Sequence, residues 1–328
     1  MRFCEWLESS TIDDVIKAKG TLSKEIDRMS TQDRIWDAMW YFGREEVTSI
    51  GVYSADTNKA GFVQILTIND LLQHLVEYLR KNVSVDLETF EKEFLQLPLC
   101  SFMTCKSEDS QPLFLGRETC LRELIETLAE SQEYNLGNRI FVGDKDNIED
   151  TVSVKDLVHY IFVCSHSIQD VLQAHALPAL YPGTKTPSPL SSSALVESSE
   201  SAWTALKKLL DFCPFQVVGI TDPSTGNLIG YLSATDFMPT DNQQDIFPLI
   251  ANLKLSVAEF SRIICKTPTR LIDAFTFRDN MTLEQLIERF LKLGVDMLWR
   301  IAFTGQVIGV VTTYDLLSYF KRCSDLCY

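Results

Sequence analysis

The octapeptide GVVTTYDL occupies residues 309–316, and GYLSATDF at residues 230–237 repeats its pattern. Both read glycine, two apolar residues, a hydroxyl residue, two further residues, aspartate and an apolar residue. The same [ST]-x-x-D core recurs twice more, so four copies are present. They end in Asp70, Asp156, Asp236 and Asp315. The copies lie roughly 80 residues apart, a spacing that indicates internal structural repeats.

The sequence around each motif predicts one order of elements. Two apolar extended segments precede the motif and are joined by turn residues such as DPSTGN at 222–227. Upstream, apolar residues at i, i+3, i+4 and i+7 predict an amphipathic helix, as at Leu283, Leu286, Ile287 and Phe290. A shorter lead helix comes first. We therefore expect an α/β fold in which each repeat reads lead helix, helix, strand, strand, helix.

The spacing also sets the domain organisation that we expect. A single small sheet cannot bury both faces, so the repeats should pair. The repeats are predicted at residues 1–82, 83–164, 165–240 and 241–328. Repeats 1 and 2 would form one module, 1–164, and repeats 3 and 4 a second, 165–328.

Composition excludes several classes of protein. The chain has 328 residues, of which 45% are hydrophobic and 23% charged, and its net charge is −15. That charge argues against nucleic-acid partners and against anionic membranes. No long apolar run predicts a transmembrane helix, and the first residues lack the features of a signal peptide. We expect a cytoplasmic or nuclear protein.

Cysteine and histidine usage indicates neither a disulfide framework nor a metal site. The nine cysteines are odd in number and scattered, without a C-x-x-C pair, and only four histidines are present. The chain contains no phosphate-binding P-loop, dinucleotide, serine-hydrolase or zinc-protease motif. We expect no catalytic residues, no metal and no resident cofactor.

The repeated motif allows two interpretations. Serine or threonine can cap a helix N-terminus, and aspartate in the first turn meets the positive end of the helix dipole. The same aspartate could accept hydrogen bonds from a vicinal diol, and the exposed N–H groups could meet a phosphate. Duplication copies caps as readily as sites. The motif alone therefore leaves both interpretations open.

A strand, [ST]-x-x-D and a helix, repeated at this period, resemble the CBS domain. CBS domains commonly pair into Bateman modules, so the resemblance implies two modules in a disc-like, pseudo-fourfold arrangement. The length of the chain and the segment GFVQILTINDLL (61–72) are similar to the γ subunits of AMP-activated protein kinases. This resemblance implies a non-catalytic, energy-sensing regulatory subunit that binds AMP, ADP or ATP between repeats. Its partners would be kinase α and β subunits.

The resemblance also implies binding residues. In the γ family the motif aspartate contacts the ribose hydroxyls, and basic residues hold the phosphates. The matching ribose-side residues are Asp70, Asp236 and Asp315, with Thr67, Ser233 and Thr312 three positions before them. Arg139 and Arg300 match the arginine that opens the first strand of repeats 2 and 4, and Lys155 matches a phosphate-facing lysine of repeat 2.

The chain departs from the γ pattern at several phosphate-side positions. Asn138 and Trp299 replace histidines, Thr48 replaces an arginine, and Tyr314 replaces a second serine. Asp156 is present where repeat 2 of the family usually lacks aspartate. Its strand is polar, so we do not expect nucleotide there.

A different function is also consistent with the sequence. The segment DIFPLIANLKLSVAEF (245–260) resembles other four-CBS proteins at least as closely as the γ family. The alternative is an interaction scaffold without nucleotide sensing. Such a scaffold could be an inhibitor of type-2A-like phosphatases, with a phosphatase catalytic subunit as partner, or a stand-alone CBS protein.

Overall fold

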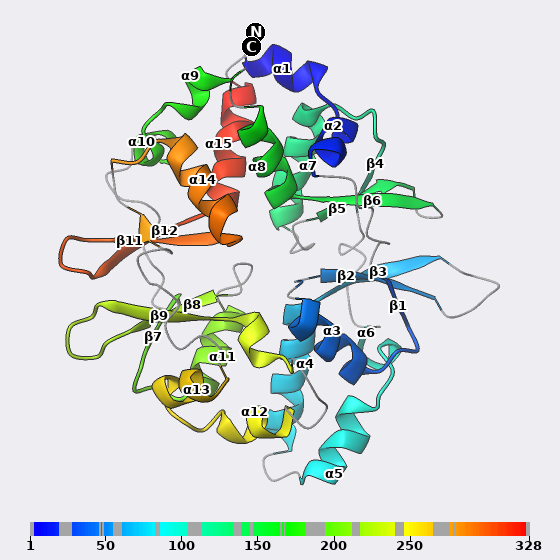
Figure 1. Ribbon diagram of the computed structural model, residues 1–328. Helices are drawn as coiled ribbons and strands as arrows, with labels where there is room; N and C mark the ends of the chain where they lie inside the picture. The colour runs from blue at the N-terminus through cyan, green and yellow to red at the C-terminus, as the bar shows by residue number, and fades with distance from the viewer. Residues whose placement is uncertain are drawn as a thin grey trace. The chain divides into compact units, whose positions relative to one another are not determined.

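The protein contains four small sheets of identical topology (Figure 1). The computed structural model describes residues 3–19, 28–45, 47, 49–54, 61–82, 86–103, 113–133, 139–144, 147–164, 166, 168–181, 194–211, 217–239, 246–264, 276–277 and 280–325. In each sheet the first strand pairs parallel with the second, and the second pairs antiparallel with the third. The predicted α/β class is confirmed. The disc-like arrangement and the module boundaries stay predictions.

The strands come three to a repeat. They are β1 (Arg28–Ser30), β2 (Ser49–Tyr53), β3 (Phe62–Thr67), β4 (Phe114–Leu115), β5 (Arg139–Gly143), β6 (Ile148–Ser153), β7 (Leu195–Glu197), β8 (Val217–Thr221), β9 (Leu228–Ser233), β10 (Thr276–Phe277), β11 (Met297–Ile301) and β12 (Val307–Thr312). In every sheet the antiparallel pairing shifts register after the fourth residue of the second strand. This shared irregularity indicates that the four sheets are copies of one unit.

Helices precede and follow each sheet. They are α1 (Phe3–Ser9), α2 (Ile12–Ala18), α3 (Ile35–Glu45), α4 (Ile68–Lys81), α5 (Leu87–Phe90), α6 (Cys100–Met103), α7 (Leu121–Glu133), α8 (Val154–Val163), α9 (Gln169–Leu172), α10 (Ala176–Leu180), α11 (Ala202–Asp211), α12 (Ile246–Asn252), α13 (Val257–Ile264), α14 (Leu283–Leu293) and α15 (Thr313–Asp325). A π-helical segment, η1 (Glu91–Leu95), follows α5, and a 3₁₀ turn, η5 (Ala234–Phe237), follows β9. None of the helices in the described ranges is both long and apolar enough to cross a membrane.

The chain divides into two compact units, each with two sheets. One comprises Asp27–Ser110 and Ser191–Arg270, and holds the sheets of repeats 1 and 3. Its core joins buried side chains of repeats 1 and 3, among them Phe42, Leu72 and Phe237, with Phe94 and Phe260 from the lead segments of repeats 2 and 4. Apolar faces at helical spacing on α3, α4 and α11 supply most of this core.

The other unit comprises Met1–Ile26, Gln111–Leu190 and Leu271–Tyr328, and holds the sheets of repeats 2 and 4. Its last helix, α15, packs against α7, α8 and α1. Aromatic pairs join these elements: Trp6 stacks on Tyr160 with ring centroids 5.6 Å apart, and Phe3 lies 6.1 Å from Phe320. The predicted apolar face of α14 is buried, as its spacing requires, and the helix packs against α8, α9 and α10.

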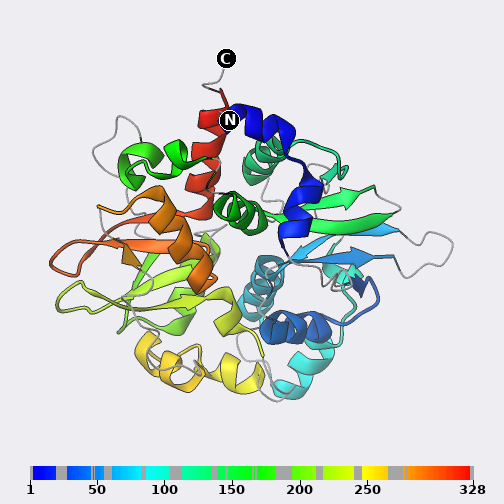
Figure 2. The same cartoon turned by 45° about the horizontal axis from the view of Figure 1, so that its top comes forward.

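Each lead helix packs on the body of the neighbouring repeat rather than on its own. Residues at the start of α2 bridge to repeat 2, where Ile12 N–H donates to the Thr119 carbonyl at 3.0 Å. The α9–α10 segment does the same on repeat 4, and its Ala176 N–H donates to Met281 at 3.0 Å. Figures 1 and 2 show α9 and α10 beside α14 and α15. In the other unit, residues 87–103 of repeat 2 pack on repeat 1, where Pro98 bridges to Arg34. The α12–α13 segment of repeat 4 packs on repeat 3, where Ser256 bridges to Ser201.

The cysteines of the described ranges differ in bonding state. Cys4 of α1 is disulfide-bonded, whereas Cys100, Cys120, Cys164 and Cys323 are free thiols. The cysteine spacing does not indicate this bond, because a bond depends on proximity in the fold and not on spacing along the chain.

Candidate functional site

All four [ST]-x-x-D motifs form helix caps. In repeat 4 the Thr312 N–H and hydroxyl both donate to Oδ2 of Asp315, each at 2.7 Å. The other three motifs make the same two bonds. The N–H and hydroxyl distances, in that order, are 2.7 and 2.7 Å at Thr67–Asp70, 2.9 and 2.8 Å at Ser153–Asp156, and 2.7 and 2.9 Å at Ser233–Asp236. Capping is therefore the common property of the motif, and features outside the motif must distinguish a binding site from a cap.

The repeat 4 motif is partly buried. Thr312 and Thr313 are buried at the junction of β12 and α15. Burial raises the pKa of the Asp315 carboxyl, although the hydrogen bonds from Thr312 act to lower it. The two bonds from Thr312 use Oδ2 of Asp315. A carboxylate has further acceptor positions, so a second group can approach it.

A side chain from the lead segment of repeat 3 approaches this carboxylate. Tyr181 immediately follows α10, and its hydroxyl donates to the Val310 carbonyl of β12 at 3.3 Å. The phenol and the Asp315 carboxyl lie close enough for each to shift the pKa of the other. Burial raises the pKa of Tyr181, and the charge of Asp315 raises it further. A neutral phenol therefore covers the aspartate of the repeat 4 motif.

Two arginines act on this Asp315–Tyr181 pair. Arg322 of α15 donates to the carbonyls of Ala179 and Leu180, at 3.1 and 2.8 Å, and so holds the end of α10. Burial is the largest influence on the pKa values of both Asp315 and Tyr181, and the charge of Arg322 opposes it at each group. Arg300 of β11 also lowers the pKa of Tyr181 through its charge. Asp315 and Tyr181 thus lie within electrostatic reach of each other and of Arg322, and Arg300 lies within reach of Tyr181.

The structure therefore brings together three of the residues identified from sequence: Thr312, Asp315 and Arg300. It adds Tyr181 and Arg322, which the sequence analysis did not identify. Tyr181 is the C-cap residue of α10, and Arg322 is a basic residue in the last turn of α15. Neither position carries a sequence signal that would associate it with Asp315, because both depend on how distant segments pack.

The predicted equivalence of Arg139 and Arg300 is wrong. In the strand register Arg139 lies opposite Ser153, whereas the residue opposite Thr312 is Met297. Arg300 is therefore three positions further along its strand than Arg139, and the two side chains leave opposite faces of their sheets. Strand β11 begins at the buried Met297, so Arg300 is not its first residue. Arg139 lies opposite Ser153 of the repeat 2 motif, whereas Arg300 lies opposite Gly309.

Lys155 makes two contacts at the end of α14. Its ammonium donates to the Gly294 carbonyl at 2.7 Å and lies 3.5 Å from the Asp296 carboxylate. Gly294 caps α14 in a left-handed conformation with φ of 65°, and the Asp296 carbonyl accepts from Thr313 N–H at 3.0 Å. A phosphate at Lys155 would compete with these partners.

The repeat 2 motif is covered by a cation. Lys19 caps the C-terminus of α2, and its ammonium donates to the Thr151 carbonyl at 2.9 Å. It also lies 3.7 Å from Asp156 and 3.6 Å from Asp150. This arrangement supports the prediction that Asp156 does not bind nucleotide.

The remaining motifs lie in the other unit. Thr67 and Asp70 begin the 14-residue helix α4, whereas Ser233 and Asp236 begin only the short turn η5. Asp236 is buried at 9% exposure. Among the positions that depart from the γ pattern, Trp299 and Tyr314 are buried core residues. Thr48 and Asn138 lie outside the described residues.

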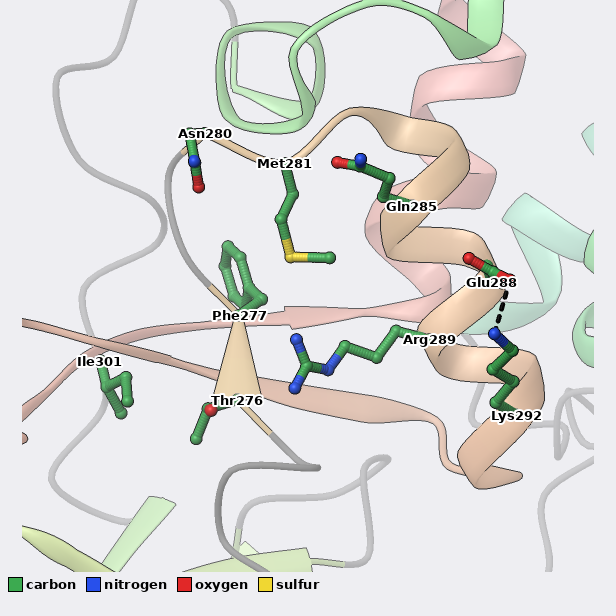
Figure 3. A pocket seen from close by; sticks show the side chains of 9 residues that line it. All are labelled: Thr276, Phe277, Asn280, Met281, Gln285, Glu288, Arg289, Lys292 and Ile301. Atoms are coloured by element: carbon green, nitrogen blue, oxygen red, sulfur yellow. Dashed lines mark ion pairs between the residues drawn. The ribbon is translucent and has the colours of Figure 1, made fainter.

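A pocket of about 720 Å³ lies elsewhere in the repeat 4 unit, between β10 and α14 (Figure 3). Arg289 extends from α14 toward Phe277 and Thr276 of β10, and Lys292 pairs with Glu288 at 2.6 Å. None of the residues identified from sequence lines this pocket. In the part of the chain that the structure describes, no three His, Cys, Asp or Glu side chains are grouped to hold a metal ion.

Comparison with known proteins identifies the fold. Residues 266–322, which contain Arg300, Thr312 and Asp315, match the family model of the CBS domain. No curated protein sequence matches the chain. A solved structure from Methanocaldococcus jannaschii, described as a proposed archaeal homologue of γ-AMPK, has a TM-score of 0.69. It is 15% identical, and the match covers 93% of this chain and 99% of that one. An uncharacterised conserved protein from Pyrococcus horikoshii has a TM-score of 0.52 at 15% identity, with 95% and 100% covered.

Proposed function

We propose that this CBS-domain protein is a non-catalytic regulatory subunit that binds AMP, ADP or ATP at the Thr312–Asp315 motif. The observation that carries the proposal is the partly buried Asp315 carboxylate, which is held by Thr312 and lies within reach of the Arg322 charge, with Arg300 acting on the adjacent Tyr181. A nucleotide would modulate a partner enzyme by changing how the repeats pack. The similarity in fold to a proposed γ-AMPK homologue supports a regulatory rather than a catalytic function.

The chemistry of the grouping suits a ribonucleotide. A carboxylate accepts hydrogen bonds from both hydroxyls of a ribose, and guanidinium groups bind phosphate through paired N–H donors. Partial burial strengthens such bonds relative to water. The net charge of −15 makes local arginines necessary, because the overall field repels an anionic ligand.

We also propose nucleotide binding at the other predicted sites, where fewer observations support it. Ser233 with Asp236, and Thr67 with Asp70, form equivalent caps in the other unit. Arg139 and Lys155 remain proposed phosphate ligands of repeat 2. The proposed partners are kinase α and β subunits, as the likeness to γ subunits implies.

The alternative is an interaction scaffold that binds a phosphatase catalytic subunit or another protein without sensing nucleotide. One observation favours it. In both motifs of the repeat 2 and repeat 4 unit, a side chain of the protein itself already contacts the aspartate, Lys19 at Asp156 and Tyr181 at Asp315. In a scaffold these contacts would hold the caps closed permanently.

Calorimetric titration of the full chain with AMP, ADP and ATP tests the proposal. Asp315→Asn should weaken binding at least tenfold, since a hydrogen bond to a charged group contributes about 1.5–3 kcal/mol. Asp156→Asn is the matched control, because it changes an equivalent cap that is paired with Lys19, and it should bind as the wild type does. Circular dichroism would verify that both variants fold.

Absence of binding by the wild type, measured by calorimetry and equilibrium dialysis with all three nucleotides, would favour the scaffold. An equal loss of nucleotide affinity in Asp315→Asn and Asp156→Asn would mean that the substitutions act by weakening the helix caps and not by removing a ligand contact. Co-purification with kinase α and β subunits or with a phosphatase catalytic subunit would then separate the proposed partners.

A further inference from the structure

We propose that the pocket between β10 and α14 binds a small organic carboxylate, with the acid group at Arg289 and an apolar body against Phe277 and Met281. The pocket has a volume of about 720 Å³, which is within the range of small-molecule sites in proteins. Neither Thr312 nor Asp315 lines it. The inference therefore concerns a second ligand and does not depend on the proposed function.

The lining of the pocket combines apolar surface with a guanidinium group (Figure 3). Phe277 of β10, Ile301 of β11 and Met281, which precedes α14, supply the apolar surface. Arg289 extends from α14 toward Thr276 and Phe277 of the facing strand. A site of this composition suits a ligand that has an anionic group and an apolar body.

The first strands and the helices that follow them align without a gap between repeats 3 and 4. Leu195 of β7 and Thr276 of β10 each pair with the third residue of the next strand. Ala202 of α11 and Leu283 of α14 follow at the same distance along the chain, and each is the first buried residue of its helix. The two repeats can therefore be compared position by position around the pocket.

A basic residue stands at the same position of α11 and α14. In repeat 3 it is Lys208, whose ammonium donates to the Leu195 carbonyl at 3.0 Å and lies 3.0 Å from Oε2 of Glu200. In repeat 4 it is Arg289, and Met281 occupies the position of Glu200. Repeat 4 thus keeps the cation of this pair and replaces the carboxylate by a thioether that lines the pocket. A ligand carboxylate at Arg289 would take the place that Glu200 fills in repeat 3.

The other two repeats lack the cation. Repeat 1 has Tyr41 and Asp33 at the two positions, and repeat 2 has Thr127 and Thr119. Repeat 4 is therefore the one copy that has a cation at the helix position without a carboxylate at the other. This difference between copies of one unit points to a ligand as the source of the missing carboxylate.

The charges around the pocket favour a ligand with a negative group. Lys292 also lines the pocket, but its ammonium pairs with Glu288 at 2.6 Å, so these two charges offset each other. Arg289 adds a positive charge in a chain whose net charge is −15. A guanidinium binds a carboxylate through two parallel N–H···O bonds, and the apolar part of the ligand gains by leaving water.

NMR titration of the full chain with phenylacetate and hexanoate, and with their uncharged amides, tests the proposal. The wild type should bind both acids more tightly than the amides. Arg289→Gln should weaken binding of the acids at least tenfold, because a charge-assisted bond is lost. Met281→Glu should do the same, because its carboxylate would occupy Arg289 as Glu200 occupies Lys208. Lys292→Gln is the matched control: it removes a cation that is already paired, and it should change the affinity by no more than about twofold.

Urea denaturation shows whether Met281→Glu forms the intended ion pair. The substitution should raise the midpoint of unfolding of the wild type and should not raise that of Arg289→Gln. An equal effect in the two backgrounds would mean that Met281 and Glu200 do not occupy corresponding places, and the proposal would be wrong.

The binding outcomes are equally decisive. If the amides bind as tightly as the acids, or if Arg289→Gln binds the acids as the wild type does, Arg289 does not hold the acid group. If the wild type binds neither acid in the millimolar range, the pocket is not a carboxylate site. Met281→Glu should leave AMP binding unchanged, so failure of this proposal leaves the proposed function at Asp315 standing.

Discussion

The motifs of repeats 2 and 4 lie in one unit and share their capping geometry, yet different residues cover them. Oδ2 of Asp156 and of Asp315 each accepts an N–H and a hydroxyl bond, with all four distances between 2.7 and 2.9 Å. Lys19 lies over Asp156, whereas Tyr181 lies over Asp315. An N-cap is needed wherever a helix begins, so duplication preserves it. The residue above it differs between the two repeats, and in the proposed function that residue decides whether a ligand can enter.

The two covering residues differ in how readily they can be replaced. Removing Lys19 from Asp156 would leave a partly buried carboxylate without its cation. Tyr181 is neutral, so moving it away from Asp315 breaks no ion pair. A neutral cover therefore suits a binding site, and a cationic cover suits a permanent cap.

The largest effect is expected from making repeat 4 resemble repeat 2. Tyr181→Lys would bring an ammonium to Asp315, and this cation would hold the carboxylate in a charge-assisted bond. AMP affinity, measured by calorimetry, should fall by more than about tenfold, because the ligand would have to break that bond. Tyr181→Met, which is flexible but uncharged, should keep binding. Wild-type affinity in Tyr181→Lys would contradict the idea that the charge of the covering residue matters.

The shared cap predicts equal stability losses in the two repeats. Thr312→Val and Ser153→Ala each remove one capping hydroxyl and should lower the free energy of unfolding by about 1 kcal/mol. Urea denaturation measures both. Only Thr312→Val should also weaken AMP binding, since only its aspartate is proposed to bind ligand. A large stability loss in one variant and none in the other would show that the two caps are not equivalent.

The sequence predicts those parts of the fold that follow from local rules. The [ST]-x-x-D pattern predicts the caps, and all four form. The periodic apolar residues of α14 are buried, and DPSTGN forms the β8–β9 turn, with Gly226 at φ of 70°. Each of these depends on residues within a few positions of one another, so the pattern contains the information.

The rest of the site depends on contacts between distant segments. The Tyr181 hydroxyl reaches a carbonyl 129 residues away, and Arg322 reaches one 143 residues away. No local pattern encodes the exchange of lead helices that brings these groups together. The mistaken equivalence of Arg139 and Arg300 has a related cause, because an apolar segment does not reveal where its strand begins. Arg300 follows three buried residues that are already part of β11.

The pH dependence of stability offers a smaller test at Asp315. Burial raises its pKa in the folded state above the ordinary value of 3.8. The folded protein then holds the proton more tightly than the unfolded chain, so the stability linked to this group is present below 3.8 and lost as pH rises through the folded pKa. Asp315→Asn removes this dependence. Urea denaturation of both proteins between about pH 4 and pH 7 measures this. The free energy of unfolding of Asp315→Asn, relative to that of the wild type, should increase as pH rises.

If the stability of Asp315→Asn relative to the wild type instead fell as pH rises, the folded protein would stabilise the charged form of the carboxylate. Tyr181 and the two arginines would then outweigh burial. Tyr181→Phe provides the internal check. Loss of a donor to the carboxylate should raise the pKa of Asp315 further, which NMR titration of the Asp315 side-chain carboxyl measures.

The smallest effect is expected at the cationic cover of repeat 2. Lys19 is 37% exposed and Asp156 is 22% exposed, so water and salt screen the pair. Lys19→Met should therefore lower the free energy of unfolding by less than about 1 kcal/mol, and high salt should shrink the difference. Lys17→Met, on the same helix, is the matched control because its 69%-exposed ammonium pairs only locally with Asp13. A salt-insensitive loss of several kcal/mol at Lys19 would mean that the packing of its methylene chain, rather than its charge, closes the repeat 2 motif.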